Sequence, residues 1–414
     1  MRKPRKQKVT AENLYLASRA FSSFLALIFS IIYSRSLGPE NRGVLGAVFL
    51  IVLLLWQIIC GGFNLTFRTS VSKWNPEDYV WRFLKISSLL ACLVAIVGTI
   101  SIYIYAQNKN SLTKYYIVVS FLYFLITVLS DQLTQLMLAL LKFEIVWKVE
   151  ILTISLQIFF YFILIQISQV SVGIAVLLSL LFSYLFVIGW YLKFLISGQK
   201  YIKLKNSSSV LPINFFQNGS KNYVFVIFSS LADRADRLIV LLVFSSAMFG
   251  KYAVMTGLLL AFRFIPESLS NLILSGRAKR IVGFVTKFRV MDFFLVMLLP
   301  LIATFILRIL VNHIFGENWL ITFWAIALFA FSELLRTVYI IRITATLHSN
   351  ISTSTHIYAA SLILVTESIF AFFAWHFNSI AIVPAGLCLG YALSIYLIGY
   401  SRPVSKMGGS VDST

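Results

Sequence analysis

Six arginines lie inside segments that are otherwise apolar enough to cross a membrane: Arg19, Arg234, Arg237, Arg263, Arg308 and Arg336. One arginine at the centre of a spanning helix costs about 3 kcal/mol on insertion scales. Six deep arginines would cost roughly 15–20 kcal/mol, more than the net stability of many folded domains. The chain tolerates this only if several of them face a hydrated interior and meet negative charge. This pattern predicts a transporter or channel for an anion.

The first apolar segment carries a stripe of small and polar residues. At about 100° per residue they share one narrow arc of a helix: Glu12, Arg19, Ser22, Ser23, Ala26 and Ser30. Such a stripe either lines a cavity or forms a seam of small residues against another helix. The arginine within it favours a cavity.

A second stripe, in the fourth apolar segment, brings a carboxylate to membrane depth. It consists of Ser120, Thr127, Asp131, Thr134 and Gln135. Counted at about 1.5 Å per residue from the segment ends, Asp131 and Arg19 reach a similar depth in the cytoplasmic half. We expect Asp131 to form either a structural salt bridge with Arg19 or an ion-coupling site.

The densest cluster of charge lies in the seventh segment: Ser229, Ser230, Asp233, Arg234, Asp236 and Arg237. Asp233 and Arg237 are one helical turn apart, so part of this charge can neutralise itself. Arg234 falls near the middle of the bilayer. An Asp-x-x-Asp pair can hold a divalent metal, but two arginines are interleaved with this one and no second acidic motif is present. We therefore expect no metal and no other cofactor.

Three later segments also place charge inside the membrane. Arg263 lies near mid-depth, with Glu267 one turn further inward. Glu333 and Arg336 lie close to the cytoplasmic end of their segment, where Arg336 either reaches the interface or faces the interior. Glu367 has no local partner at the middle of its segment, and a buried unpaired carboxyl can exchange a proton.

Together these side chains suit a phosphate group. Arginine offers planar, forked donors to phosphate oxygens, and a low dielectric strengthens the bonds. A cavity for cationic drugs should have the opposite sign, with acidic residues and few arginines. The predicted anion-binding residues are Arg19, Arg234, Arg237, Arg263 and Arg336, and the predicted ion-coupling or gating residues are Asp131, Glu267, Glu333, Glu367, Asp233 and Asp236.

The elements that position these residues are membrane-spanning helices. Of the 414 residues, 59% are hydrophobic and only 12% charged, which is typical of an integral membrane protein. Each apolar run is close to the length that a helix needs to cross the hydrocarbon core. Twelve runs lie at approximately 12–33, 44–66, 82–106, 115–140, 147–167, 171–195, 221–243, 251–274, 290–311, 318–341, 355–375 and 380–400. The number of helices is therefore twelve, or differs from twelve by one.

The basic residues predict the orientation of the chain. Lys and Arg number 35 against 15 Asp and Glu, but most lie at the ends of spans, which argues against a nucleic-acid partner. The positive-inside rule then places both termini in the cytoplasm. The start of the chain is expected to be an uncleaved first span, because its apolar run is too long for a signal peptide.

A polar stretch divides the apolar runs into two sets of six. We expect an N-terminal lobe at 1–197, a cytoplasmic linker at 198–220 and a C-terminal lobe at 221–414. Gly43 and Gly250 follow the first helix of each half within similar short motifs. This echo predicts two parallel repeats around a central cationic cavity.

Three motifs make the sequence resemble a known family. They are Arg35-Ser36-Leu37-Gly38-Pro39-Glu40-Asn41-Arg42-Gly43, then Asp233-Arg234-Ala235-Asp236-Arg237 followed by Phe249-Gly250-Lys251-Tyr252, and Phe315-Gly316-Glu317-Asn318-Trp319. With them the chain resembles the bacterial O-antigen and exopolysaccharide flippases of the multidrug/oligosaccharidyl-lipid/polysaccharide exporter superfamily. The resemblance covers the whole chain, although the motifs are short.

The resemblance implies a transporter in the bacterial cytoplasmic membrane. Its cargo would be undecaprenyl-pyrophosphate-linked oligosaccharide, moved from the inner to the outer leaflet by alternating access. A proton or sodium ion would drive the cycle, and a polysaccharide polymerase would be a partner. Two alternatives stay open: a drug or small-molecule exporter of the same superfamily, and a membrane polymerase or glycosyltransferase of the same pathway. The enzyme is disfavoured because such enzymes normally have a sizeable loop outside the membrane.

Overall fold

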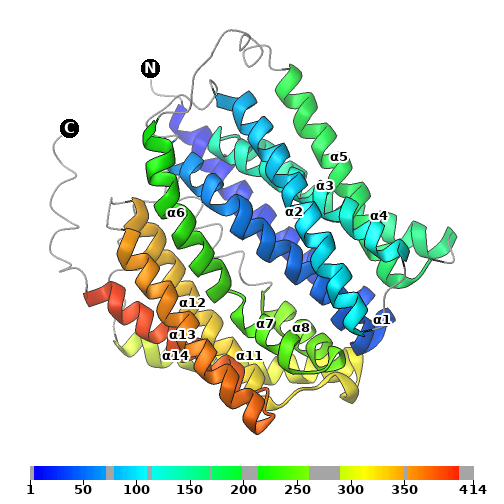
Figure 1. The fold of residues 1–414 in the computed structure, drawn as a ribbon, viewed down its shortest axis with the longest axis vertical. Helices are drawn as coiled ribbons and strands as arrows, with labels where there is room; N and C mark the ends of the chain where they lie inside the picture. Colours follow the sequence, from blue (N-terminus) through cyan, green and yellow to red (C-terminus); the bar gives the residue numbers. More distant parts are fainter. Residues whose placement is uncertain are drawn as a thin grey trace. The chain divides into compact units, whose positions relative to one another are not determined.

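The structure is an all-helical membrane protein, as the sequence predicted (Figure 1). The computed structural model describes residues 4–70, 79–109, 114–167, 170–197, 213–260, 290–348 and 353–400. No strand occurs in these ranges. Seven helices in them are long and apolar enough to cross a membrane, and one of these, Ala17–Arg68, covers two of the predicted spans.

The chain forms two compact units. Unit 1 comprises Met1–Ile227 and Ser245–Gly257, and unit 2 comprises Phe228–Phe244 and Leu258–Thr414. Unit 1 contains α1 (Pro4–Ser70), α2 (Val80–Lys109), α3 (Lys114–Ala139), α4 (Phe143–Ile167), α5 (Val172–Ser197), most of α6 (Ile213–Ala232) and most of α8 (Ser246–Leu260). Unit 2 contains α7 (Ala235–Val243), α11 (Val290–Phe315), the short 3₁₀ helix Glu317–Trp319, α12 (Phe323–His348), α13 (Thr353–Phe377) and α14 (Ile382–Tyr400).

A kink in α1 joins the first two predicted spans. Gly38 has φ 74° and ψ 167°, and Pro39 follows it. A positive φ is readily adopted only by glycine, and the proline ring removes a helical hydrogen bond while favouring the start of the next helix. The kink therefore lets one long helix supply two spans.

Unit 1 has an aromatic and aliphatic core that fixes the first half of α1. The ring of Phe29 packs edge-on against Tyr33 and Tyr161 at 5.2 and 5.3 Å between centroids. Phe124 and Leu45 are completely buried nearby in the same cluster. Large apolar side chains on α2, such as Leu89 and Ile96, are exposed, as expected of a helix that faces lipid. The polar stripe of α1 is thus held against α4.

The two echoing glycines meet in unit 1. A Cβ atom built on Gly43 would lie 2.0 Å from the carbonyl oxygen of Ser246, and one on Gly250 would lie 1.8 Å from that of Pro39. No larger residue fits unless the two backbones separate. Gly43 and Gly250 therefore allow the start of α8 to pack directly on the turn after the kink.

Glycines also bring α13 and α14 together in unit 2. A Cβ on Gly390 would lie 2.5 Å from Thr366 Oγ1 and 2.9 Å from Ile363 Cα. Gly386 precedes it by one helical turn and faces Glu367, whose Oε1 would be 3.1 Å from an added Cβ. This spacing of small residues is typical of close helix packing in membranes.

Candidate functional site

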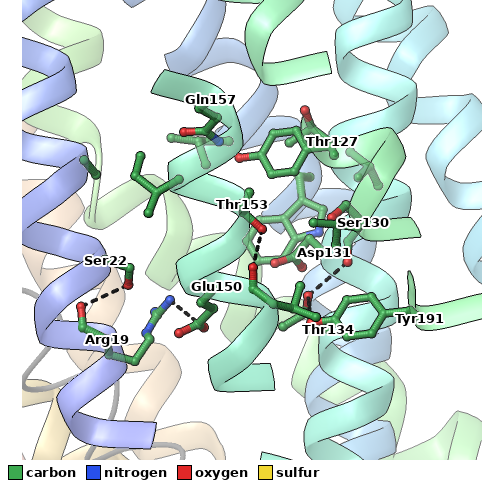
Figure 2. A pocket seen from close by; sticks show the side chains of 18 of the residues that line it. Arg19, Ser22, Thr127, Ser130, Asp131, Thr134, Glu150, Thr153, Gln157 and Tyr191 are labelled. Atoms are coloured by element: carbon green, nitrogen blue, oxygen red, sulfur yellow. Dashed lines mark hydrogen bonds and ion pairs between the residues drawn. The ribbon is translucent and has the colours of Figure 1, made fainter. Parts of the chain in front are cut away.

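Unit 1 contains a polar cavity of about 380 Å³. Its walls are formed by α1, α3, α4 and α5 (Figure 2). Its polar and charged lining residues, which we call the unit 1 cavity residues, are Arg19, Ser22, Ser23, Trp56, Thr127, Ser130, Asp131, Thr134, Glu150, Thr153, Gln157, Tyr184 and Tyr191. The rest of the wall is apolar, from residues such as Ala26, Val52 and Val149. The stripes predicted on the first and fourth segments thus both contribute to one cavity.

Arg19 is held in this cavity by an ion pair that the sequence did not predict. Its Nη1 lies 3.0 Å from Oε1 of Glu150 on α4, and Figure 2 shows the two side chains facing one another. Glu150 was not among the predicted site residues. The signal that marks it is a polar stripe on α4, because Glu150, Thr153 and Gln157 recur at helical spacing and all line the cavity.

Asp131 lies in the same cavity as Arg19, on α3. Next to it, the hydroxyl of Thr134 donates to the carbonyl of Ser130 in its own helix (3.0 Å) and lies 3.3 Å from the hydroxyl of Tyr191, from which it can accept. The hydroxyl of Tyr191 therefore joins α5 to the polar face of α3. Arg19, Asp131 and Glu150 are the charged residues of the lining. The unit 1 cavity thus has one positive and two negative side chains.

Unit 2 has its charge at a break between two helices. The sequence predicted an uninterrupted helix over 221–243, but α6 ends at Ala232 and α7 begins at Ala235. Arg234 has φ −129° and ψ 6°, outside the helical region. Arg237 Nη2 donates to the backbone carbonyl of Asp233 at 3.0 Å, so a side chain binds the backbone at the break.

The carboxylate of Asp233 binds two arginines from different elements. Oδ1 accepts from Nε of Arg336 on α12, and Oδ2 lies 3.5 Å from Nη1 of Arg234. Arg336 also lies 3.8 Å from Glu333. Arg237 is 3.7 Å from Asp236. Arg336 and Arg234 are each only 6% exposed, so Arg336 faces the interior of unit 2, one of the two placements that the sequence left open.

Glu367 on α13 is a deeply buried carboxylate of unit 2. It is 1% exposed, and neither of its oxygens has a hydrogen-bond partner among the described residues. A buried carboxylate without such bonds is costly, which is the situation expected of a group that binds a proton or cation during a cycle. In the described part of the chain, no group of three His, Cys, Asp or Glu is arranged to hold a metal.

Three further charged residues of the predicted spans remain to be placed: Arg263, Glu267 and Arg308. Arg263 and Glu267 lie outside the described residues. Arg308 is exposed on α11. The structure therefore brings Arg19 and Asp131 together in unit 1, and Asp233, Arg234, Asp236, Arg237, Glu333 and Arg336 together in unit 2.

The fold is similar to that of solved transporters. A mutant of the Vibrio cholerae MATE transporter VcmN matches with a TM-score of 0.62 and 11% identity over 96% of each chain. A multidrug resistance MATE family transporter of the MOP superfamily, in an outward-facing conformation, matches with a TM-score of 0.60 and 11% identity over 96% of this chain and 94% of its own. A further MATE structure has a TM-score of 0.65 and 11% identity over 95% and 94%.

These likenesses show the fold and leave the cargo open. No family model matches the chain, and no curated protein matches its sequence. MATE transporters have two six-helix lobes, so the predicted fold class is confirmed. Only the sequence motifs support a resemblance to the narrower family of oligosaccharide flippases.

Proposed function

We propose that this chain is a secondary exporter that works by alternating access. The observation that carries the proposal is the broken helix α6–α7, whose break holds buried charged residues within an otherwise apolar fold. Discontinuous helices at membrane depth are the usual place where secondary transporters bind substrate and ions. The MATE-like fold supports the same class of protein.

The cargo that we propose is an undecaprenyl-pyrophosphate-linked oligosaccharide. The flippase-like motifs and the excess of buried arginine support it. Arg234, Arg237 and Arg336 already bind carboxylate oxygens, and pyrophosphate oxygens are acceptors of the same kind. Arg263 completes the proposed anion-binding set, whereas Arg19, which the sequence analysis grouped with these arginines, is paired with Glu150 in the unit 1 cavity. The head group would exchange for these carboxylates, while the prenyl chain stays in lipid.

A proton or sodium ion is the proposed driving ion. A cycle can be biased only by a ligand that binds its two states differently. Glu367, Asp131 and Glu267 are the proposed coupling carboxylates, and Glu333, Asp233 and Asp236 are proposed to gate the arginines that they contact. Glu367 is the first choice, since its oxygens have no hydrogen-bond partner among the described residues.

A second candidate cargo is a small cationic molecule. Two observations favour it: the unit 1 cavity holds two carboxylates and one arginine, and one of the similar structures is described as a multidrug resistance transporter. The comparisons support this class more directly than they support a lipid-linked sugar. An enzyme of the polysaccharide pathway has no comparable support.

One experiment separates these cargoes. The gene is deleted alone, and the lipid-linked sugars of each leaflet and the uptake of a cationic dye are measured. Complete repeat units trapped on the inner leaflet identify the flippase. Normal lipid-linked sugars with raised dye retention identify the small-molecule exporter. Unpolymerised single units on the outer leaflet point to a polymerase and contradict both transport proposals.

The anion-binding residues are tested separately by transport of the lipid-linked cargo. Arg234→Ala and Arg263→Ala are each expected to lower the initial rate at least tenfold, since a bond to a charged group contributes about 1.5–3 kcal/mol. The matched control is Arg308→Ala, because Arg308 is exposed on α11. If Arg234→Ala and Arg263→Ala both leave transport intact, the anion-binding proposal is wrong.

A further inference from the structure

The unit 1 cavity mixes hydrogen-bond donors and acceptors in an unusual way. Asp131 and Glu150 only accept when ionised, whereas Arg19 only donates. The hydroxyls of Ser22, Thr134 and Thr153 donate to carbonyls of their own helices, so toward a ligand they accept. Both roles are open to the other polar groups of the lining: Ser23, Thr127, Ser130, Gln157, Tyr184 and Tyr191. A ligand that fits this cavity must therefore both donate and accept at several points.

This requirement discriminates between classes of ligand. Phosphate oxygens only accept, and two carboxylates in so small a cavity would repel them. A simple ammonium cation only donates, so it offers no acceptor to Arg19 or to the other donors of the lining. A sugar hydroxyl donates once and accepts twice, so it can bond to every polar group of the lining. We propose that the unit 1 cavity is a binding site for the glycan of a lipid-linked oligosaccharide. This proposal rests on the cargo proposed above.

Trp56 supports this proposal with a donor that has no acceptor. Its indole Nε1 is buried, and among the described residues no atom accepts its hydrogen bond. An indole N–H normally finds a partner when buried, so a ligand oxygen is a suitable acceptor. The half-buried rings of Trp56 and Tyr184 also offer apolar faces, and the carbon face of a pyranose ring packs well against such surfaces.

The size of the cavity agrees with a short glycan. Its lining on α1 extends from Arg19 to Ala26 and on α3 from Thr127 to Thr134, which is about two helical turns or 10 Å. A volume of about 380 Å³ lies within the usual range of small-ligand sites. The site would therefore recognise the sugars of the cargo.

Two substrates of different glycan length test the proposal. The purified protein is placed in lipid vesicles with undecaprenyl-pyrophosphate carrying either the complete repeat unit or its first sugar only, and the translocation of each is measured. Trp56→Phe removes the indole N–H but keeps a ring, and Thr153→Val removes a hydroxyl at constant shape. Each variant is expected to lower translocation of the complete unit about tenfold, the effect of one lost bond to a buried polar group. The single-sugar lipid should be slowed about threefold or less.

A matched threonine outside the cavity provides the control. Thr99 on α2 donates to the carbonyl four residues earlier at 2.7 Å, as Thr153 does on α4. Thr99→Val should leave the ratio of the two rates at the wild-type value. Because the single-sugar lipid reports on folding, a misfolded variant is recognised by loss of both activities together with loss of a monodisperse protein peak.

The outcomes separate the glycan site from the proposed function. A selective loss of the complete unit supports the site. Equal slowing of both substrates by folded variants, or no slowing of either, overturns the glycan site and leaves the flippase proposal standing. If the wild-type protein moves neither lipid, the proposed cargo is wrong and the glycan site falls with it.

Discussion

The unit 1 cavity and the charged break of unit 2 use membrane-embedded charge in two different ways. In the cavity, Arg19 and Glu150 form one ion pair whose side chains are 28% and 14% exposed, and hydroxyls surround it. At the break, Asp233 is shared by Arg234 and Arg336, whose side chains are only 7% and 8% exposed. The first arrangement leaves polar groups facing open space. The second uses charge to close a gap in a helix.

The arginines that lie inside the membrane therefore have different roles in the two units. An ion pair beside a polar cavity keeps part of its hydration, so its partners can be exchanged for a ligand at modest cost. A more deeply buried arginine can exchange its partner only for another anion, because an isolated buried charge is strongly unfavourable. We therefore expect stability to depend more on the arginines of unit 2 than on Arg19, and recognition of the glycan to depend on the cavity of unit 1.

The largest expected effect comes from Arg336→Met. The substitution leaves Asp233 and Glu333 without the guanidinium that they contact, and breaking a buried pair in this way costs about 3–5 kcal/mol. Arg19→Met, in the more exposed pair, should cost about 1 kcal/mol or less. The folded fraction after heating in detergent, measured by size-exclusion chromatography, compares the two variants.

Removing both partners tests whether the broken ion pair causes the loss of stability in Arg336→Met. The double variant Asp233→Asn with Arg336→Met should recover part of the lost stability, with a coupling energy of about 1–3 kcal/mol. Equal destabilisation by Arg19→Met and Arg336→Met, or no recovery in the double variant, would contradict the contrast between the two regions.

The sequence predicted the architecture better than the partners of the charges. Hydropathy and length are local properties, so the all-helical membrane fold followed from them. Counting depth along the spans put Arg19 and Asp131 at a similar level, and both line one cavity, but the partner of Arg19 is Glu150. The local rule of one helical turn paired Asp233 with Arg237, yet Asp233 contacts Arg336, 103 residues away. Glu150 was missed for the same reason, since its partner lies 131 residues earlier. Tertiary packing decides such pairs.

The break between α6 and α7 also could not be read from residue types. The segment contains no proline or glycine between Ser229 and Leu238, and these are the usual causes of a helix break. Side chains stabilise the break: Arg237 donates to the backbone carbonyl of Asp233, and the carboxylate of Asp233 accepts from Arg336 on α12. A cluster of charge within an apolar run is therefore the only sequence signal of the break.

The next largest effect is expected at the glycine contact of unit 1. Gly43→Ala places a methyl group 2.0 Å from a backbone oxygen, which cannot move as a flexible side chain would. Overpacking of this kind costs about 1–3 kcal/mol. Gly257→Ala is the control, because nothing lies within 4 Å of its added Cβ and alanine favours the helix by about 1 kcal/mol. Gly43→Ala should lower the thermal midpoint and Gly257→Ala should raise it. Equal shifts would show that the close approach of α1 and α8 does not contribute to stability.

Glu367 should separate stability from function within unit 2. Glu367→Met removes a buried carboxylate that has no hydrogen-bond partner among the described residues, so it should raise the free energy of unfolding by about 1–2 kcal/mol. Transport driven by a proton or sodium gradient should fall to its level without a gradient. Arg336→Met, by contrast, should lose stability. A destabilised Glu367→Met variant that keeps ion-driven transport would exclude Glu367 as the coupling carboxylate.

The smallest effect is expected from an ion pair on the surface of the helix that carries Glu150. Lys148 and Glu144 are one turn apart on α4 at 2.8 Å, with side chains 50% and 69% exposed. Exposed pairs of this spacing contribute about 0.3–0.5 kcal/mol, so Lys148→Ala should leave the thermal midpoint almost unchanged. Arg19→Met removes the partner of Glu150, which lies on the same helix two residues after Lys148, so the two variants compare a cavity ion pair with an exposed one. If Lys148→Ala lowers the thermal midpoint as much as Arg19→Met does, then the stability depends on the presence of an ion pair on α4 and not on its position in the cavity.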